Sequence, residues 1–198
     1  MRSLTFIIVG LFSLNLFAQR SVSIPQMVKN ECMACHKDAT MTNAPMISGQ
    51  NKDFLEFELF NFRDYVRDHE IMNQVMEDFT DLEVKEIATY ISNLSLCDFQ
   101  AQVDEHPQAD VKKGEKIFNR SCFSCHKKDT SGIGPVIHGQ KTLYMENAIR
   151  SFQTTWYEPR PSRIDMRTYT DMLSDQDIKD VAAYLNEQKI CVEQAEKL

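Results

Sequence analysis

The chain has 198 residues, with 22 Lys or Arg against 29 Asp or Glu, so its formal net charge at pH 7 is −7. The net negative charge is concentrated in the first half of the chain, which argues against nucleic acid as a partner for that half, and we expect no nucleic-acid partner. Once a leader segment is set aside, the length suits two small domains of about 80 to 90 residues each.

The N-terminal segment at residues 1–18 is typical of a secretory signal peptide. Arg2 supplies the positive charge, Leu4 to Phe17 is largely apolar, and Ala18 suits the last position before cleavage. The segment is short for a membrane span, and no later stretch approaches the required length. We expect an exported protein with peripheral or no membrane contact; an uncleaved N-terminal anchor is the alternative.

A Cys-x-x-Cys-His signature stands at residues 32–36 and again at residues 122–126. It is the attachment signature of a c-type haem: the thiols form thioethers with the haem vinyl groups, and the histidine binds the iron. The expected attachment and iron-binding residues are Cys32, Cys35 and His36 in the first motif and Cys122, Cys125 and His126 in the second. Two c-type haems in one chain indicate electron transfer.

A Cys-x-x-Cys pair is also found in zinc sites and in thioredoxin-like dithiols. A structural zinc site usually draws two such pairs from nearby sequence, whereas these pairs are 90 positions apart. A dithiol does not require a histidine directly after the second cysteine. The haem interpretation is therefore preferred.

The two motifs belong to a longer internal repeat. Residues 45–50 (Pro-Met-Ile-Ser-Gly-Gln) match residues 135–140 (Pro-Val-Ile-His-Gly-Gln) at the same offset of 90 positions. The second copy then gains four residues, and residues 79–90 match residues 173–184 at an offset of 94. The chain therefore consists of two copies of one unit.

We place the first copy at residues 19–97 and the second at residues 112–198. The polar segment between them, residues 98–111, contains Pro107 and is expected to be an acidic linker. The formal charge is −6 for the first copy, −4 for the linker and +2 for the second copy. Such a dipole could steer partners to one end of the molecule; an accidental asymmetry of a solvated surface is the alternative.

Every expected element is a helix, and no segment alternates like a strand, so the predicted fold class is all-α. Thr80 and Ser174 are suitable N-caps, each followed by acidic residues, for the last helix of each copy. Other helices are expected before each haem motif and from about Lys52 and Thr142.

A methionine thioether is the expected second ligand of each iron, because it favours the ferrous state and closes the iron to substrates. Among ten methionines, Met72 and Met166 occupy equivalent positions in the two copies. We assign these two as axial ligands. Met76 is the main rival in the first copy; His69 could compete, although a surface role suits it better, and no histidine outside the motifs is assigned to iron.

Each copy resembles a class I cytochrome c domain, with the haem motif near its start, an Ala-Pro or Gly-Pro turn, a later Met and a terminal helix with an aromatic residue. The duplicated arrangement with Pro-x-Ile-x-Gly-Gln is similar to the dihaem cytochrome c4 family of bacterial periplasms. The resemblance implies two tandem class I cytochrome c domains, each wrapped around one covalent haem. It also implies a pseudo-twofold axis and haem edges near the domain interface.

The resemblance also implies contacts around each haem. The carbonyl oxygens of Pro45 and Pro135 would accept hydrogen bonds from the two motif histidines, which fixes the imidazole tautomer. Basic residues near the haem propionates would be Arg67 in the first copy and Arg160 or Arg163 in the second.

The sequence departs from the family pattern in two places. Ile24 and Val28 stand where the second copy has Gly114 and Phe118, so the close helix crossing of such domains is in question for the first copy. The four extra residues near 156–163 alter the loop on the methionine side of the second haem. We therefore expect the two reduction potentials to differ.

Two cysteines, Cys97 and Cys191, remain outside the haem motifs. Both follow the terminal helix of their own copy, and an exported protein meets an oxidising compartment. An interdomain disulfide, two free thiols and a link to another chain all remain open.

The expected function is that of a periplasmic dihaem c-type cytochrome that carries electrons between redox partner proteins, towards a terminal oxidase. Its irons would be His/Met-ligated, and it would not be an enzyme, because the paired methionines leave no open iron. One alternative is an electron-accepting subunit of a periplasmic dehydrogenase or reductase. The other is a dihaem enzyme of the peroxidase or thiosulfate-oxidising type.

Overall fold

The computed structural model describes residues 22–37, 41, 43–98, 101–154 and 166–190, and every regular element in those residues is a helix. The all-α fold class is thereby confirmed. In the described part of the chain, no helix is both long enough and apolar enough to cross a membrane. The predicted signal peptide, Arg160 and Arg163 lie outside the described residues.

Domain one is built on two long helices that pack against each other, α3 (Lys52–Arg63) and α5 (Asp81–Ser92). Its shorter elements are α1 (Ile24–Met27), a π-helical turn (Val28–Cys32), α2 (Met33–His36), α4 (Glu70–Met76) and a 3-10 turn (Leu96–Asp98). The core joins buried side chains of α5, such as Val84 and Ile87, to Leu59 and Phe62 of α3.

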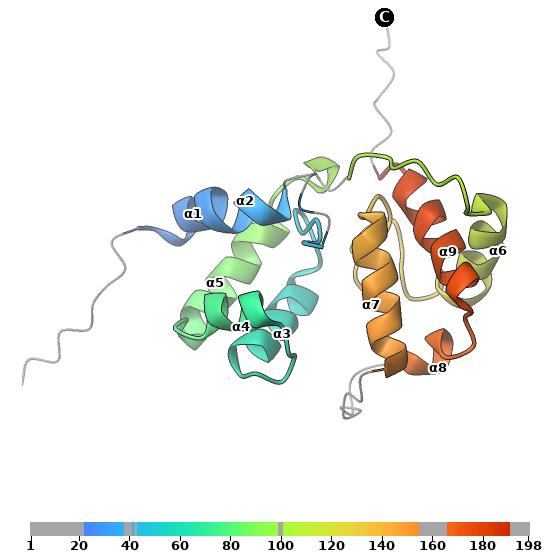
Figure 1. Cartoon of the computed structure of the whole chain (residues 1–198). Coiled ribbons are helices and arrows are strands. Elements are labelled where there is room, and N and C mark those ends of the chain that lie inside the picture. Colours follow the sequence, from blue (N-terminus) through green and yellow to red (C-terminus); the bar gives the residue numbers. More distant parts are fainter. Residues whose placement is uncertain (1–21, 38–40, 42, 99–100, 155–165, 191–198) are drawn as a thin grey trace, which may run out of the picture.

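Domain two repeats this plan beside domain one (Figure 1). Its elements are α6 (Val111–Ser121), α7 (Thr142–Thr154), α8 (Arg167–Thr170) and α9 (Asp175–Glu187). Buried Ile178 and Val181 of α9 pack on Ile149 of α7 and Phe118 of α6. The predicted helices from Lys52 and Thr142 are thus present at the expected positions.

Matching capping boxes start the last helix of each domain. The Thr80 hydroxyl accepts a hydrogen bond from the Glu83 N–H, and the Glu83 carboxylate accepts one from the Thr80 N–H. Ser174 and Asp177 form the same pair at the start of α9. Each box satisfies two backbone donors that the first helical turn leaves free, and both predicted N-caps are confirmed.

Gly114 allows α6 to cross α9 at close range. A Cβ placed on Gly114 would lie 2.0 Å from the carbonyl oxygen of Asp180, and buried Phe118 packs beside the crossing with its ring 5.6 Å from that of Tyr184. Domain one has Ile24 at the equivalent position, and its N-terminal segment is divided into α1 and a π-helical turn instead of one continuous helix. The replacement of glycine by Ile24 in the first copy therefore coincides with a break in the helix that is continuous in domain two.

The segment between the two domains lies against domain two over residues 101–110 (Figure 1). The Ala101 N–H donates to the Gly139 carbonyl at 2.7 Å, and the Asp104 N–H donates to Oδ1 of Asn186 at 2.8 Å. Asn186 is fully buried, and its Nδ2 donates to the carbonyls of Gln102 and Gln140. One buried amide thus fastens the linker to domain two.

Cys97 is disulfide-bonded, whereas the four cysteines of the haem motifs are free. A free thiol at Cys97 is therefore excluded. Cys191, its candidate partner from the sequence, lies outside the described residues, so the interdomain pairing stays a proposal.

The close crossing predicts that Gly114→Ala destabilises domain two by about 2 kcal/mol, because the added methyl group overpacks the contact with Asp180. This outcome is opposite to that expected from helix propensity, on which Ala is about 1 kcal/mol better than Gly. Thermal unfolding of the dihaem protein measures the change. Lys116→Ala, at an exposed site of the same helix, is the control and should be close to neutral; equal stability of the two variants would contradict the prediction.

Candidate functional site

Each Cys-x-x-Cys-His motif lies at the C-terminal end of the first helical segment of its domain. The π-helical turn ends at Cys32 and α2 ends at His36, while α6 ends at Ser121, directly before Cys122. The four motif cysteines are partly buried free thiols, and burial is the main cause that raises the pKa of Cys32 and of Cys122 to about 11. The thiols of Cys32 and Cys122 are therefore neutral, and each packs against the apolar core of its domain.

The motif histidines are held in one orientation by backbone carbonyls. Nδ1 of His36 lies 2.8 Å from the Pro45 carbonyl oxygen, and Nδ1 of His126 lies 2.8 Å from that of Pro135. A carbonyl can only accept, so Nδ1 carries the proton and donates, which leaves the Nε2 lone pair free to bind iron. These are the hydrogen bonds that the family resemblance implies.

Burial also keeps both imidazoles neutral. It is the largest influence on the pKa of His36 and of His126, and it lowers both pKa values from 6.5 although the proline carbonyls act in the opposite direction. A neutral imidazole is the form that binds a metal. The two thiols and the oriented, neutral imidazole of each motif therefore match the donor set that a c-type haem needs.

Gly134 leaves room for the second motif histidine. A Cβ on Gly134 would lie 2.7 Å from Cε1 of His126, closer than an ordinary carbon contact. Domain one has Ala44 at the matching position, so the two histidine pockets are alike in their hydrogen bonds and differ in their packing.

Met72 lies on α4 and packs on the same core of domain one as Cys32. Its N–H donates to Nδ1 of His69, which caps α4 and contacts the ring of Phe62 edge-on. Met76, the rival, is almost fully enclosed in that core. Met72 and Cys32 therefore pack against the same core, and His69 has a role in starting the helix.

Met166 is partly buried and directly precedes α8. Its carbonyl oxygen accepts hydrogen bonds from the N–H groups of Tyr169 and Thr170, at 3.0 and 3.1 Å, and so starts the helix. Residues 155–165, which precede it in the sequence, lie outside the described residues. Arg67, the candidate propionate partner in domain one, is paired with Glu58 at 2.7 Å and stacks over the Phe62 ring.

Two glutamines to which the sequence analysis gave no role, Gln50 and Gln140, connect the domains. The amide of Gln140 forms two hydrogen bonds with the backbone of Met46, and the amide of Gln50 forms two with the backbone of Val136. Their recurrence in the repeated Pro-x-Ile-x-Gly-Gln motif was the signal that could have identified them. Met46 and Val136 directly follow the prolines that hold the histidines. The interface and the two candidate haem sites therefore share the peptide groups that join each proline to the next residue.

His138 is buried in domain two, with its ring 5.0 Å from that of Phe118 in an edge-on contact. A backbone group of Lys127 lies near, but neither ring nitrogen reaches hydrogen-bond geometry. Burial lowers the pKa of His138 to about 4, so the ring is neutral at physiological pH. It serves as a packing residue here.

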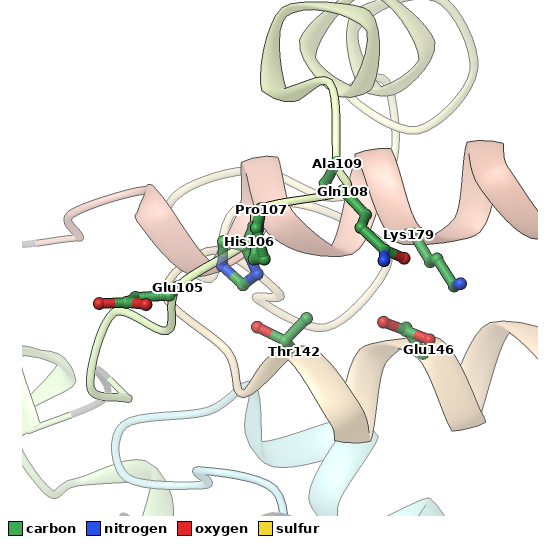
Figure 2. A pocket seen from close by; sticks show the side chains of 8 residues that line it. All are labelled: Glu105, His106, Pro107, Gln108, Ala109, Thr142, Glu146 and Lys179. Atoms are coloured by element: carbon green, nitrogen blue, oxygen red, sulfur yellow. The ribbon is translucent and has the colours of Figure 1, made fainter.

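A shallow hollow on domain two lies between linker residues 105–109, α7 and α9 (Figure 2). Thr142 and Glu146 line it from α7, and Lys179 lines it from α9. Its lining includes neither haem motif. The candidate cofactor sites are therefore elsewhere, at the motif histidines.

Comparison with known proteins gives a consistent result. The family model described as "Cytochrome c" matches residues 111–189. The chain is 27% identical to cytochrome c-552 of Acidithiobacillus ferridurans, covering 82% of this chain and 75% of the relative. It is 25% identical to a thiosulfate dehydrogenase electron acceptor of Thiomonas intermedia, covering 80% of this chain and 79% of that protein.

Single-domain proteins and solved structures match as well. Cytochrome c6 of Parathermosynechococcus lividus is 32% identical over 40% of this chain and 92% of its own length. The structure of cytochrome c4 from Acidithiobacillus ferrooxidans superposes with a TM-score of 0.66 at 25% identity, covering 78% of this chain and 97% of that one. Cytochrome c4 of Pseudomonas stutzeri shares the fold with a TM-score of 0.67 at 21% identity, covering 83% of this chain and 96% of that one.

Proposed function

The chain belongs to the cytochrome c family in its duplicated, dihaem c4 form, and we propose that it carries single electrons between redox partner proteins in the periplasm. The carrying observation is the repeated site: in both domains a Cys-x-x-Cys-His motif presents a neutral histidine whose Nδ1–H is bonded to a proline carbonyl. When bound, each c-type haem supplies an iron that alternates between the ferric and ferrous states.

The residues of the chain hold and insulate these groups. The thiols of Cys32 and Cys35, and their equivalents in domain two, would form the covalent links, and the two motif histidines would bind the irons through Nε2. The hydrogen bonds that orient the two imidazoles would limit their movement when the iron changes oxidation state, which favours fast electron transfer. The apolar cores against which Cys32 and Cys122 pack would exclude water from the haems.

Met72 and Met166 are proposed as the second iron ligands. Support comes from their equivalence in the repeat and from the packing of Met72 against the same core as Cys32. If a histidine and a methionine bind each iron, neither iron would have a place for substrate, and the protein would carry electrons without substrate chemistry of its own. Cleavage of residues 1–18 and delivery towards a terminal oxidase complete the proposal.

Met72→Ala and Met166→Ala test the ligand assignment. Each change should convert one of the two haems from a low-spin to a water-ligated, high-spin state and raise its affinity for added ligands such as imidazole. Optical and electron paramagnetic resonance spectra of the purified protein report the spin state. Met76→Ala is the matched control: it should lower stability by roughly 2–5 kcal/mol as a core cavity while both haems stay low-spin. A high-spin haem in Met76→Ala with an unchanged spectrum in Met72→Ala would transfer the role to Met76.

A second candidate function has a specific observation in its favour, the similarity to the thiosulfate dehydrogenase electron acceptor over 80% of this chain. The chain would then accept electrons from a thiosulfate-oxidising enzyme. Stopped-flow mixing with such an enzyme and thiosulfate should reduce both haems, at a rate that falls as salt screens the charges of the two proteins. No reduction by this enzyme, in a protein that a small-molecule reductant reduces fully, would contradict this candidate and leave the general carrier function intact.

A further inference from the structure

One peptide group in each domain takes part in two functions at once. In domain one this group joins Pro45 to Met46. Its carbonyl oxygen accepts the hydrogen bond from Nδ1 of His36 at 2.8 Å, and its N–H donates to Oε1 of Gln140, in the other domain, at 2.9 Å. A continuous chain of hydrogen bonds therefore runs from the candidate iron ligand of domain one to a side chain of domain two.

Domain two has the same arrangement in reverse. The peptide group between Pro135 and Val136 accepts from Nδ1 of His126 at 2.8 Å and donates to Oε1 of Gln50, in domain one, at 2.8 Å. The two chains of hydrogen bonds are related by the internal repeat. Each histidine is thus connected, through one peptide group, to a glutamine of the opposite domain.

The glutamine amides have fixed orientations. Nε2 of Gln140 donates to the Met46 carbonyl at 3.0 Å, and Oε1 also accepts from the N–H of Lys141 at 3.0 Å. Gln50 makes the equivalent bonds, to the Val136 carbonyl at 2.9 Å and from the following N–H at 3.0 Å. In each amide the nitrogen donates one bond and the oxygen accepts two, so the oxygen and not the nitrogen faces the shared peptide N–H.

Burial strengthens the hydrogen bonds between the glutamines and the shared peptide groups. Gln140 and Met46 are each 3% exposed, Gln50 is 4% exposed and Val136 is 1% exposed. In such a desolvated interface, hydrogen bonds are electrostatically stronger than in water, and successive bonds polarise one another. Donation from the peptide N–H to a glutamine oxygen raises the electron density on the peptide carbonyl, which then accepts more strongly from the imidazole.

We infer that Gln50 and Gln140 are positioning residues that tune the electron affinity of the iron in the opposite domain. A stronger bond from Nδ1–H to the carbonyl makes the imidazole a more basic iron ligand, which favours the ferric state and lowers the reduction potential. The contact between the domains therefore influences the reduction potentials of both haems, because each domain supplies the glutamine that acts on the haem of the other. This inference rests on the proposed ligation of iron by His36 and His126.

Gln140→Met removes the amide and keeps the side-chain length. We expect the potential of the haem in domain one to shift upwards while that of the haem in domain two stays in place. Gln50→Met should produce the opposite pattern, an upward shift confined to domain two. Spectroelectrochemical titration gives the two potentials of the dihaem protein, and its paramagnetically shifted haem-methyl resonances assign each potential to a domain.

Asn147→Ala is the matched control. It removes a hydrogen bond of 3.0 Å from Nδ2 of Asn147 to Oδ1 of Asn43, which also joins the domains but does not reach a histidine peptide. Both potentials should remain unchanged in this variant. If Gln140→Met does not assemble with two haems, Gln140→Asn carries the test: its amide is one methylene short of the peptide, and the same upward shift in domain one is expected.

Equal shifts of both haems, a shift confined to the mutated domain, or no shift in a correctly assembled variant would each overturn the inference. The proposed function fails separately. It is refuted if the wild-type protein lacks two histidine-ligated c-type haems, whereas normal haem spectra without the crossed shift refute only the role of the glutamines.

Discussion

The peptide group after Pro45, with its counterpart after Pro135, is the element on which the rest of the structure depends. Its carbonyl orients the motif histidine, and its N–H pairs with a glutamine from the other domain. The two requirements act on opposite sides of one planar unit. Because that unit is rigid, the histidine cannot turn without disturbing the interface, and the domains cannot slide without disturbing the histidine.

The terminal helix of each domain positions this interface. Gly49 and Gly139 both have a φ of 67°, a left-handed conformation that favours glycine. Their N–H groups donate to the carbonyls of Ile91 in α5 and Leu185 in α9, at 3.0 and 2.8 Å. A side chain at Gly49 would also meet the backbone of Leu96 at 2.7 Å. Each bridging glutamine therefore follows a turn that is anchored to the most strongly capped helix of its own domain.

Local signals predicted much of this architecture from the sequence. The capping residues Thr80 and Ser174, the haem motifs and the 90-residue repeat indicated the helices, the two-domain plan and the haem-binding residues. What the sequence could not supply was the pairing of atoms across the repeat. Gln50 and Gln140 were visible as repeated residues, but their function depends on the packing of one domain against the other, which no periodicity or propensity encodes.

The same limit explains the other differences. The docking of the linker through buried Asn186 arises from tertiary contacts. By contrast, the hydrogen bonds between the motif histidines and the proline carbonyls followed from the family resemblance, because they lie within one domain and nine residues apart. Interactions within one repeat were thus more accessible to sequence reasoning than interactions between the two.

Hydrogen–deuterium exchange at the amides of Met46 and Val136 in the native dihaem protein tests the shared peptide group most directly. If these amides are paired across the interface, both should exchange slowly and at similar rates, through opening of the domain contact. Exchange at the rate of an unstructured peptide, while the amides of α5 and α9 remain protected, would show that the glutamines do not hold the two peptide groups.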